Sequence, residues 1–199
     1  VAGFRLDWPE YPPYDLVSAL FDFNRAATQR MAAAGAEPRD VARGALAWLA
    51  DVRHAVRGTK GLGAEETGRV LDAAGWGELF ADAGPLAPLF AAKRGAARAL
   101  IAAVRDALDA VPGPRRLLEP QAFPPPFHRI SGFPLGDLAG VADRIGIKLY
   151  TMHWPMIARY WARDLAGGTD SAALDALTAA IAQRFGFTDV LADGARLRY

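Results

Sequence analysis

The sequence contains no cysteine, which excludes disulfide bonds, thiolate metal sites and cysteine nucleophiles. Histidine is scarce as well. The three histidines stand far apart, and no two have the spacing of a metal-binding motif: His54, His128 and His153. We therefore expect neither a bound metal nor a cofactor, and any chemistry has to come from carboxylates, lysines and hydroxyls.

No sign of charge dominates, because 23 basic and 22 acidic residues leave a formal net charge of +1. Nucleic-acid binding requires a concentration of positive charge, so we expect no nucleic-acid partner. Long hydrophobic runs are missing too. The most apolar stretches, 100–104 and 145–149, are far shorter than the roughly 20 residues that cross a bilayer. We expect no membrane partner and a cytoplasmic location.

Three segments have the pattern of β-strands: 1–7, 115–119 and 145–151. Each leads into a segment rich in aromatic residues and proline, where a helix cannot continue. Helical periodicity fills the intervening segments, namely 15–35, 38–58, 65–74, 76–81, 85–111, 135–144, 156–165 and 171–185. Strands that alternate with helices indicate parallel βαβ units, and therefore an α/β protein.

We predict that residues 1–199 form a single domain, part of a (β/α)₈ TIM barrel with three parallel strands and their helices. One βα unit of such a barrel averages about 30 residues, which is much less than the interval between the first two strands. The excess, approximately 35–84, is predicted to be a helical insertion after the first strand, on the active-site face. A doubly wound open sheet is the alternative, but no glycine-rich phosphate loop joins a strand to a helix.

Alternation along the first and third strands assigns their side chains to two faces. Those expected to point outward, toward helices, are Phe4, Leu6, Ile147 and Leu149. Those expected to point into the barrel are Arg5, Asp7, Lys148 and Tyr150. Charged groups are costly inside a barrel unless they are paired or lie near its wet end, beside a substrate. The alternative is an ion network that only joins the strands.

The segments after the strands combine aromatic rings with charged and polar groups, which suits sugars because sugar rings have apolar C–H faces and polar hydroxyls. The expected substrate-binding residues are Arg5, Trp8, Tyr11, Gln121, Lys148, Tyr150, His153 and Trp154. Packing within the loop walls is the alternative for the aromatic residues among them.

Hydrolysis of a glycosidic bond ordinarily requires two carboxyl groups. Asp7 and Glu10 qualify because they follow the first strand. Glu119 is a third candidate, placed at the end of the second strand, although a salt bridge with Arg115 or Arg116 is its alternative role.

The segments 3–14, 121–126 and 148–156 resemble an uncharacterised bacterial family whose members are similar to glycoside hydrolase barrels. The resemblance spans most of the chain outside 35–84. It implies a complete barrel of about twice this length, of which the chain carries a middle portion. The start at Val1, directly in a strand-like segment, also suggests a piece of a larger protein. The implied partners are a carbohydrate substrate and the remainder of the barrel.

The leading hypothesis is therefore a glycoside hydrolase. Two alternatives remain. A lyase or aldolase would use Lys148, desolvated in a strand, to form a Schiff base with a carbonyl substrate. A carbohydrate-binding or scaffold barrel would keep the aromatic walls without a working acid pair.

Overall fold

The chain forms an α/β structure with a small parallel sheet, in a computed structural model that describes residues 3–148, 153–167 and 171–186. The strands are β1 (Gly3–Leu6), β2 (Leu117–Ala122) and β3 (Gly146–Ile147). Both strand pairs are parallel and the order is β1-β2-β3, so the predicted α/β class and parallel arrangement are confirmed.

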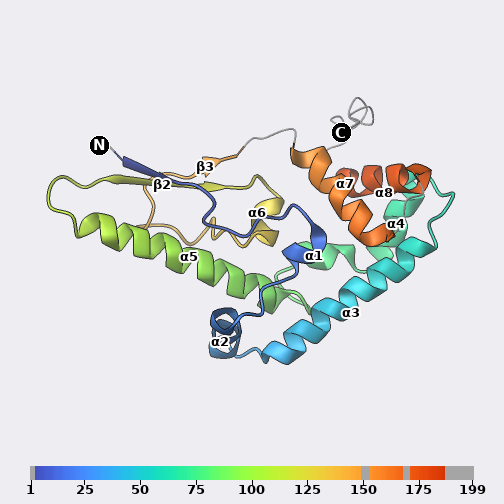
Figure 1. Cartoon of the computed structure of the whole chain (residues 1–199), viewed down its shortest axis with the longest axis horizontal. Coiled ribbons are helices and arrows are strands. Elements are labelled where there is room, and N and C mark those ends of the chain that lie inside the picture. Colours follow the sequence, from blue (N-terminus) through green and yellow to red (C-terminus); the bar gives the residue numbers. More distant parts are fainter. Residues whose placement is uncertain (1–2, 149–152, 168–170, 187–199) are drawn as a thin grey trace. The chain divides into compact units, whose positions relative to one another are not determined.

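Eight α-helices and one 3₁₀ helix accompany the strands in the described part of the chain (Figure 1). They are α1 (Leu16–Ala19), α2 (Arg25–Ala33), α3 (Pro38–Arg57), α4 (Ala64–Ala73), η1 (Trp76–Phe80), α5 (Ala87–Asp109), α6 (Phe127–Ile130), α7 (His153–Ala166) and α8 (Ser171–Arg184).

The chain divides into two compact units. The first consists of Val1–Pro13, Asp22–Val41 and Ala87–Leu149, and it contains the sheet with α2, α5 and α6. The second consists of Tyr14–Phe21, Ala42–Leu86 and Tyr150–Tyr199, and it contains α1, most of α3, and α4, η1, α7 and α8.

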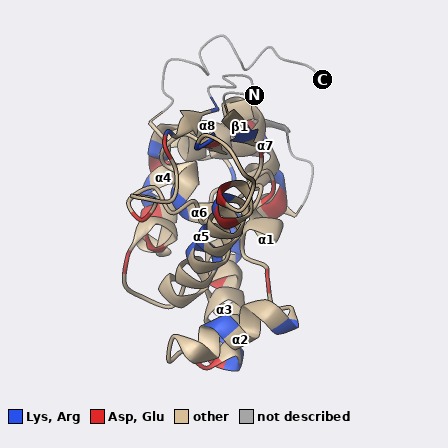
Figure 2. Ribbon diagram, turned by 90° about the vertical axis from the view of Figure 1, so that its left-hand side faces the viewer, with Lys and Arg blue, Asp and Glu red and all other residues tan. Residues whose placement is uncertain are grey.

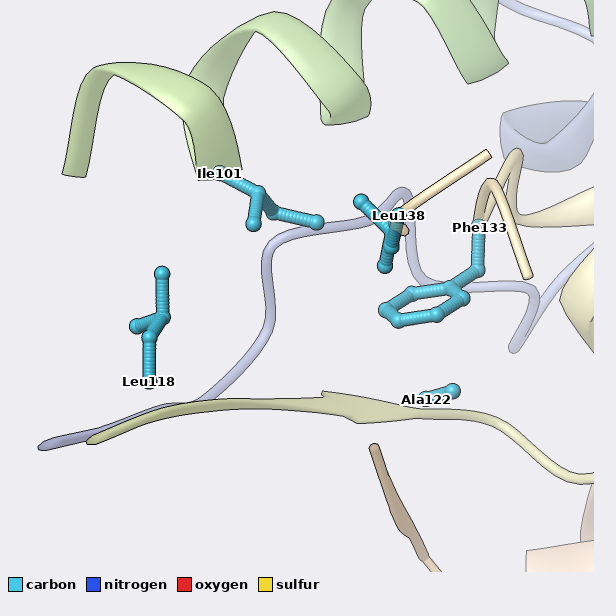
Figure 3. Packing of buried hydrophobic residues seen from close by; sticks show 5 residues of the cluster. All are labelled: Ile101, Leu118, Ala122, Phe133 and Leu138. Atoms are coloured by element: carbon cyan, nitrogen blue, oxygen red, sulfur yellow. The ribbon is translucent and has the colours of Figure 1, made fainter. Parts of the chain in front are cut away.

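In the first unit, α5 covers one face of the sheet. Ile101 of α5 faces β2 and forms a buried cluster with Leu118 and Ala122 of β2, Phe133 and Leu138 (Figure 3). Leu118 and Ala122 are separated by an even number of positions, so they point to the same side of the strand. This alternation leaves Leu117, Glu119 and Gln121 on the opposite face of β2.

Only part of the predicted outward face is packed. Leu6 contacts the buried cluster, whereas Phe4 and Ile147 are 47% and 40% exposed. Their exposure follows from position, because β1 and β3 are the outer strands and no further described strand extends the sheet beside them. Leu149 lies outside the described residues.

The connection after α6 approaches α5 very closely at Gly132, whose φ is +77°. A Cβ atom added there would lie 2.5 Å from Cβ of Lys93 on α5, a distance that real Cβ atoms do not reach. Glycine therefore meets two requirements at this position, the left-handed backbone and the absent side chain.

The second unit has an aromatic core. Trp76 of η1 contacts Trp161 of α7, with ring centroids 5.9 Å apart, and Phe185 lies 5.3 Å from Trp161. Trp48 of α3 joins this group and donates from Nε1 to the carbonyl of Gly75. Edge contacts between rings add to the hydrophobic gain from burying them.

Two predicted helices are wrong. Residues 15–35 do not form one helix: α1 ends at Ala19, and Asn24 begins α2 by accepting a hydrogen bond from the amide of Ala27. This Asn24 cap was not recognised in the periodic pattern. Residues 135–144 form turns, and the short helix lies earlier, at α6, directly after Pro126. Proline favours the first turn of a helix, so the proline-rich segment precedes a helix here.

Charge is distributed over both units, with basic and acidic residues along the same elements (Figure 2). None of the described helices is long and apolar enough to cross a membrane.

Candidate active site

Residues that follow the three strands meet at one edge of the sheet. Asp7 and Trp8 follow β1, Phe123 follows β2, and Lys148 follows β3. The carboxyl ends of neighbouring parallel strands lie at the same edge, which is where barrels and open α/β sheets bind their ligands.

Lys148 is the centre of this group. Its Nζ lies 2.9 Å from Oδ1 of Asp7, 4.0 Å from the centre of the Trp8 ring and 5.2 Å from that of Phe123. The lysine side chain is 1% exposed and that of Asp7 is 55% exposed. The contact with Asp7 lacks hydrogen-bond geometry. A carboxylate and two aromatic faces therefore compensate the buried ammonium, since rings attract cations electrostatically.

Trp8 has a left-handed backbone, with φ of 57°, and it is the only described non-glycine residue with positive φ. Such a conformation costs about 1 to 3 kcal/mol for a bulky residue and requires compensation from its surroundings. The compensation is visible: the ring meets Phe123 edge-on at 5.3 Å and lies under the Lys148 ammonium. The strained backbone position thus lies just after β1.

Glu10 is a buried carboxyl group, 7% exposed, that joins two loops. The amide of Phe123 donates to Oε1 at 2.7 Å, and the hydroxyl of Ser131 donates to Oε2. Loss of hydration raises the pKa of Glu10 to about 7, although both hydrogen bonds and the charge of Lys148 oppose that rise. Glu10 therefore changes its protonation state near neutral pH.

The sheet face opposite α5 carries a row of polar side chains. Glu119 Oε1 accepts from Nε of Arg5 at 3.0 Å and from Nε2 of Gln121 at 2.9 Å. The side chains of Arg5 and Glu119 are 70% and 24% exposed. Gly146 leaves space for this row, because a Cβ there would lie 2.0 Å from Nε2 of Gln121.

Two expectations for Glu119 are wrong. It lies within β2, opposite Arg5, rather than at the strand end. Its ion pair is with Arg5 rather than Arg115 or Arg116, because Arg115 binds Asp143 and Arg116 donates to carbonyls of the preceding turn. The carboxylate of Asp143 also accepts from the amide of Leu118, and this hydrogen bond is the main reason that its pKa is lowered. Cross-strand pairing was not visible in the local sequence.

Tyr11 directs its hydroxyl to another part of the first unit. It donates to Oδ2 of Asp22 at 2.6 Å, and its ring lies 4.9 Å from the buried ammonium of Lys93. Burial, followed by the hydrogen bond to Asp22, raises the pKa of Tyr11 to about 12. Burial also lowers the pKa of Lys93 to about 8.

Three predicted binding residues do not belong to the described part of the first unit: Tyr150, His153 and Trp154. Tyr150 lies outside the described residues. His153 and Trp154 begin α7 in the second unit, where Nδ1 of His153 and the hydroxyl of Tyr14 form a hydrogen bond of 3.2 Å. A shared site with the first-unit residues stays a prediction.

Sequence reasoning missed Ser131 and the amide of Phe123, which hold Glu10. Ser131 belongs to no motif, and a backbone amide has no signature. The proline run before α6 was the available signal, because it indicates a rigid turn that can direct amide groups toward a neighbouring loop.

Comparison with family models, curated proteins and solved structures finds no match to this chain. The chemistry of the strand ends is therefore the basis for assigning a function.

Proposed function

We propose that the chain is part of a (β/α)₈ barrel that hydrolyses glycosidic bonds, with Glu10 as the general acid and Asp7 as the second carboxylate. The observation that carries this proposal is the contrast between the two groups. Glu10 is buried with a pKa of about 7, whereas Asp7 is half exposed and lies beside an ammonium group. Neighbouring carboxyl groups in such different environments suit the division between acid and carboxylate.

The barrel is supported by the order and faces of the strands. Each strand pairs with the next one along the chain, as in a barrel, and the connections are parallel crossovers. One face packs on α5 and the other carries the Arg5, Glu119 and Gln121 row. In a closed barrel this polar row would line the interior below the site, where it would bind sugar hydroxyls.

In the proposed reaction, Glu10 transfers its proton to the leaving oxygen as the bond between that oxygen and the anomeric carbon breaks. The Asp7 carboxylate acts in one of two ways. It can bond to the anomeric carbon, after which a water that gives a proton to the Glu10 carboxylate attacks that carbon and breaks the bond to Asp7. Alternatively, it removes a proton from a water that attacks the anomeric carbon directly. Lys148 holds the carboxylate in place through the ion pair at 2.9 Å. Trp8 is 38% exposed and offers part of its ring to the apolar face of a sugar.

The geometry gives less support to a Schiff base on Lys148. A Schiff base requires a lysine nitrogen that a carbonyl substrate can reach, whereas Nζ of Lys148 is enclosed by the Asp7 carboxylate and two aromatic rings. The nitrogen is also buried and lacks an open approach for a carbonyl substrate.

The test is hydrolysis of a panel of oligosaccharides and aryl glycosides by the intact barrel protein that contains this chain, as wild type and with Asp7→Asn or Glu10→Gln. Asp106→Asn is the matched control, because Asp106 is an exposed carboxylate on α5. We expect the two site variants to lose about 10²- to 10⁴-fold in rate and the control to lose none. Full activity in both site variants would overturn the assignment. Binding without hydrolysis by the intact wild-type protein would instead favour the carbohydrate-binding alternative.

A further inference from the structure

Ser131 lies between the Glu10 carboxyl group and the carbonyl of His128. Its hydroxyl donates to Oε2 of Glu10 and also lies 3.2 Å from the His128 oxygen. Ser131 is 1% exposed, and its backbone is fixed at both ends: its amide donates to Phe127 and its carbonyl accepts from Tyr11. The hydroxyl hydrogen is therefore free to turn while the residue stays in place.

The hydrogen-bond arrangement can satisfy both protonation states of Glu10. When Glu10 is ionised, the Ser131 hydroxyl donates to Oε2. When Glu10 is protonated, its own O–H can donate to the Ser131 oxygen, and the serine hydrogen turns to the His128 carbonyl. That carbonyl already accepts from the amide of Phe133, and its second lone pair serves the serine. In both states the Phe123 amide keeps its bond to Oε1.

We propose that Ser131 is a positioning residue that lets Glu10 take up and release a proton at the strand ends without displacement, by turning its hydroxyl between Glu10 and the His128 carbonyl. The catalytic value of this switch rests on the proposed function, in which Glu10 must lose and regain a proton in each cycle. The turning of the hydroxyl itself depends only on the hydrogen bonds that join Ser131 to Glu10 and His128.

Three titratable groups surround this switch. Lys148, after β3, favours the ionised form of Glu10, whereas Asp7, after β1, disfavours it. His128, on α6, contributes its carbonyl, and burial followed by the charge of Arg129 lowers the pKa of its imidazole. Lys148 and Asp7 thus act in opposite directions on the charge of Glu10.

The experiment is an NMR titration of the side-chain carboxyl carbon of Glu10, with Glu10→Gln used to assign the signal. In Ser131→Ala we expect the midpoint to move up by about one pH unit, because the ionised carboxyl group loses a charge-assisted hydrogen bond, whereas the protonated group loses a weaker bond between neutral groups. Ser131→Thr keeps the hydroxyl and should restore most of the wild-type midpoint. An unchanged midpoint in Ser131→Ala would overturn the proposal.

A measurement on the wild-type chain covers the case in which the variants do not fold. Hydrogen exchange at the Phe123 amide should remain equally protected on both sides of the Glu10 titration, since this bond is kept in both states. Loss of protection when Glu10 becomes protonated would show that the loops separate, and would also overturn the proposal.

The outcomes separate the two proposals. A Glu10 midpoint that depends on Ser131, in a protein without activity on glycosides, would leave this inference standing and defeat the proposed function. Hydrolysis that needs Glu10, with a pH profile and midpoint unaffected by Ser131→Ala, would do the reverse.

Discussion

Lys148 and Asp7 form an ion pair whose partners differ sharply in exposure, 1% for the lysine side chain and 55% for the aspartate. The two ends of the pair are therefore not equivalent. Without the carboxylate, a buried ammonium loses its counter-ion. Without the lysine, the exposed carboxylate is hydrated by solvent.

We predict that Asp7→Asn lowers the free energy of unfolding more than Lys148→Met does. The expected losses are about 1 to 2 kcal/mol and less than about 1 kcal/mol, because the exposed partner of a half-buried pair is partly screened. The double variant should recover most of the stability that Asp7→Asn loses, because the buried ammonium that lacked its counter-ion is then also absent. Urea denaturation measures all three, and a larger loss for Lys148→Met would contradict the prediction.

Glu10 should make stability depend on pH. Its pKa rises from 4.5 to about 7 on folding, so the folded state binds the proton more tightly. Below pH 4.5 both states carry the proton and the penalty is absent. Between pH 4.5 and 7 the free energy of unfolding should fall, by at most about 3 kcal/mol in total, and the loss should be complete above pH 7. Urea denaturation of Glu10→Gln over the same range should lack this fall. A parallel pH dependence in the two proteins would refute the shift.

Gly146→Ala should disturb the polar row on the open sheet face. The added Cβ would lie 2.0 Å from Nε2 of Gln121, so that side chain has to move and lose its bond to Glu119. The flexible end of Gln121 can turn away, so we expect a loss of about 0.5 to 1.5 kcal/mol, the value of the lost hydrogen bond. Gly95→Ala is the matched control, because its Cβ meets nothing within 4 Å in α5 and alanine favours helices. Equal melting temperatures for the two variants would be inconsistent with this packing.

The cluster between α5 and β2 should respond to a cavity. Ile101→Ala removes a fully buried side chain and should cost about 2 to 5 kcal/mol. Leu100→Ala, at the next position, changes a side chain that is 48% exposed and should cost less than about 1 kcal/mol. Chemical denaturation of both variants measures the difference, and similar losses would show that α5 does not pack through Ile101.

The fold class was predictable because parallel strands and long helices leave periodic signals. The interval between the first two strands and the period of 85–111 were sufficient for the α/β arrangement and for α5. The break between α1 and α2 was not predictable from periodicity, because it depends on a single Asn24 side chain that caps the second helix. Local capping outweighed the longer pattern there.

For the candidate site, the sequence indicated which residues follow the strands but not which groups they meet. Asp7 and Lys148 were assigned to the same face by alternation, and the structure brings them into contact. The partners of Glu10 could not be predicted, because Ser131 is more than a hundred positions away and is brought near by the approach of two loops. The distance between two residues so far apart in the sequence depends on tertiary packing, which a local sequence pattern does not indicate.

The close approach of Gly132 to Lys93 has a mechanical consequence for Ser131, its neighbour in the chain. The connection after α6 packs directly against α5 at Lys93, because Gly132 has no side chain to separate them. The position of the Ser131 hydroxyl therefore depends on the packing of its loop against α5, the longest described helix of the first unit. Because the Ser131 hydroxyl donates to Glu10, the packing of this loop on α5 also fixes where that hydrogen bond to the carboxyl group is made.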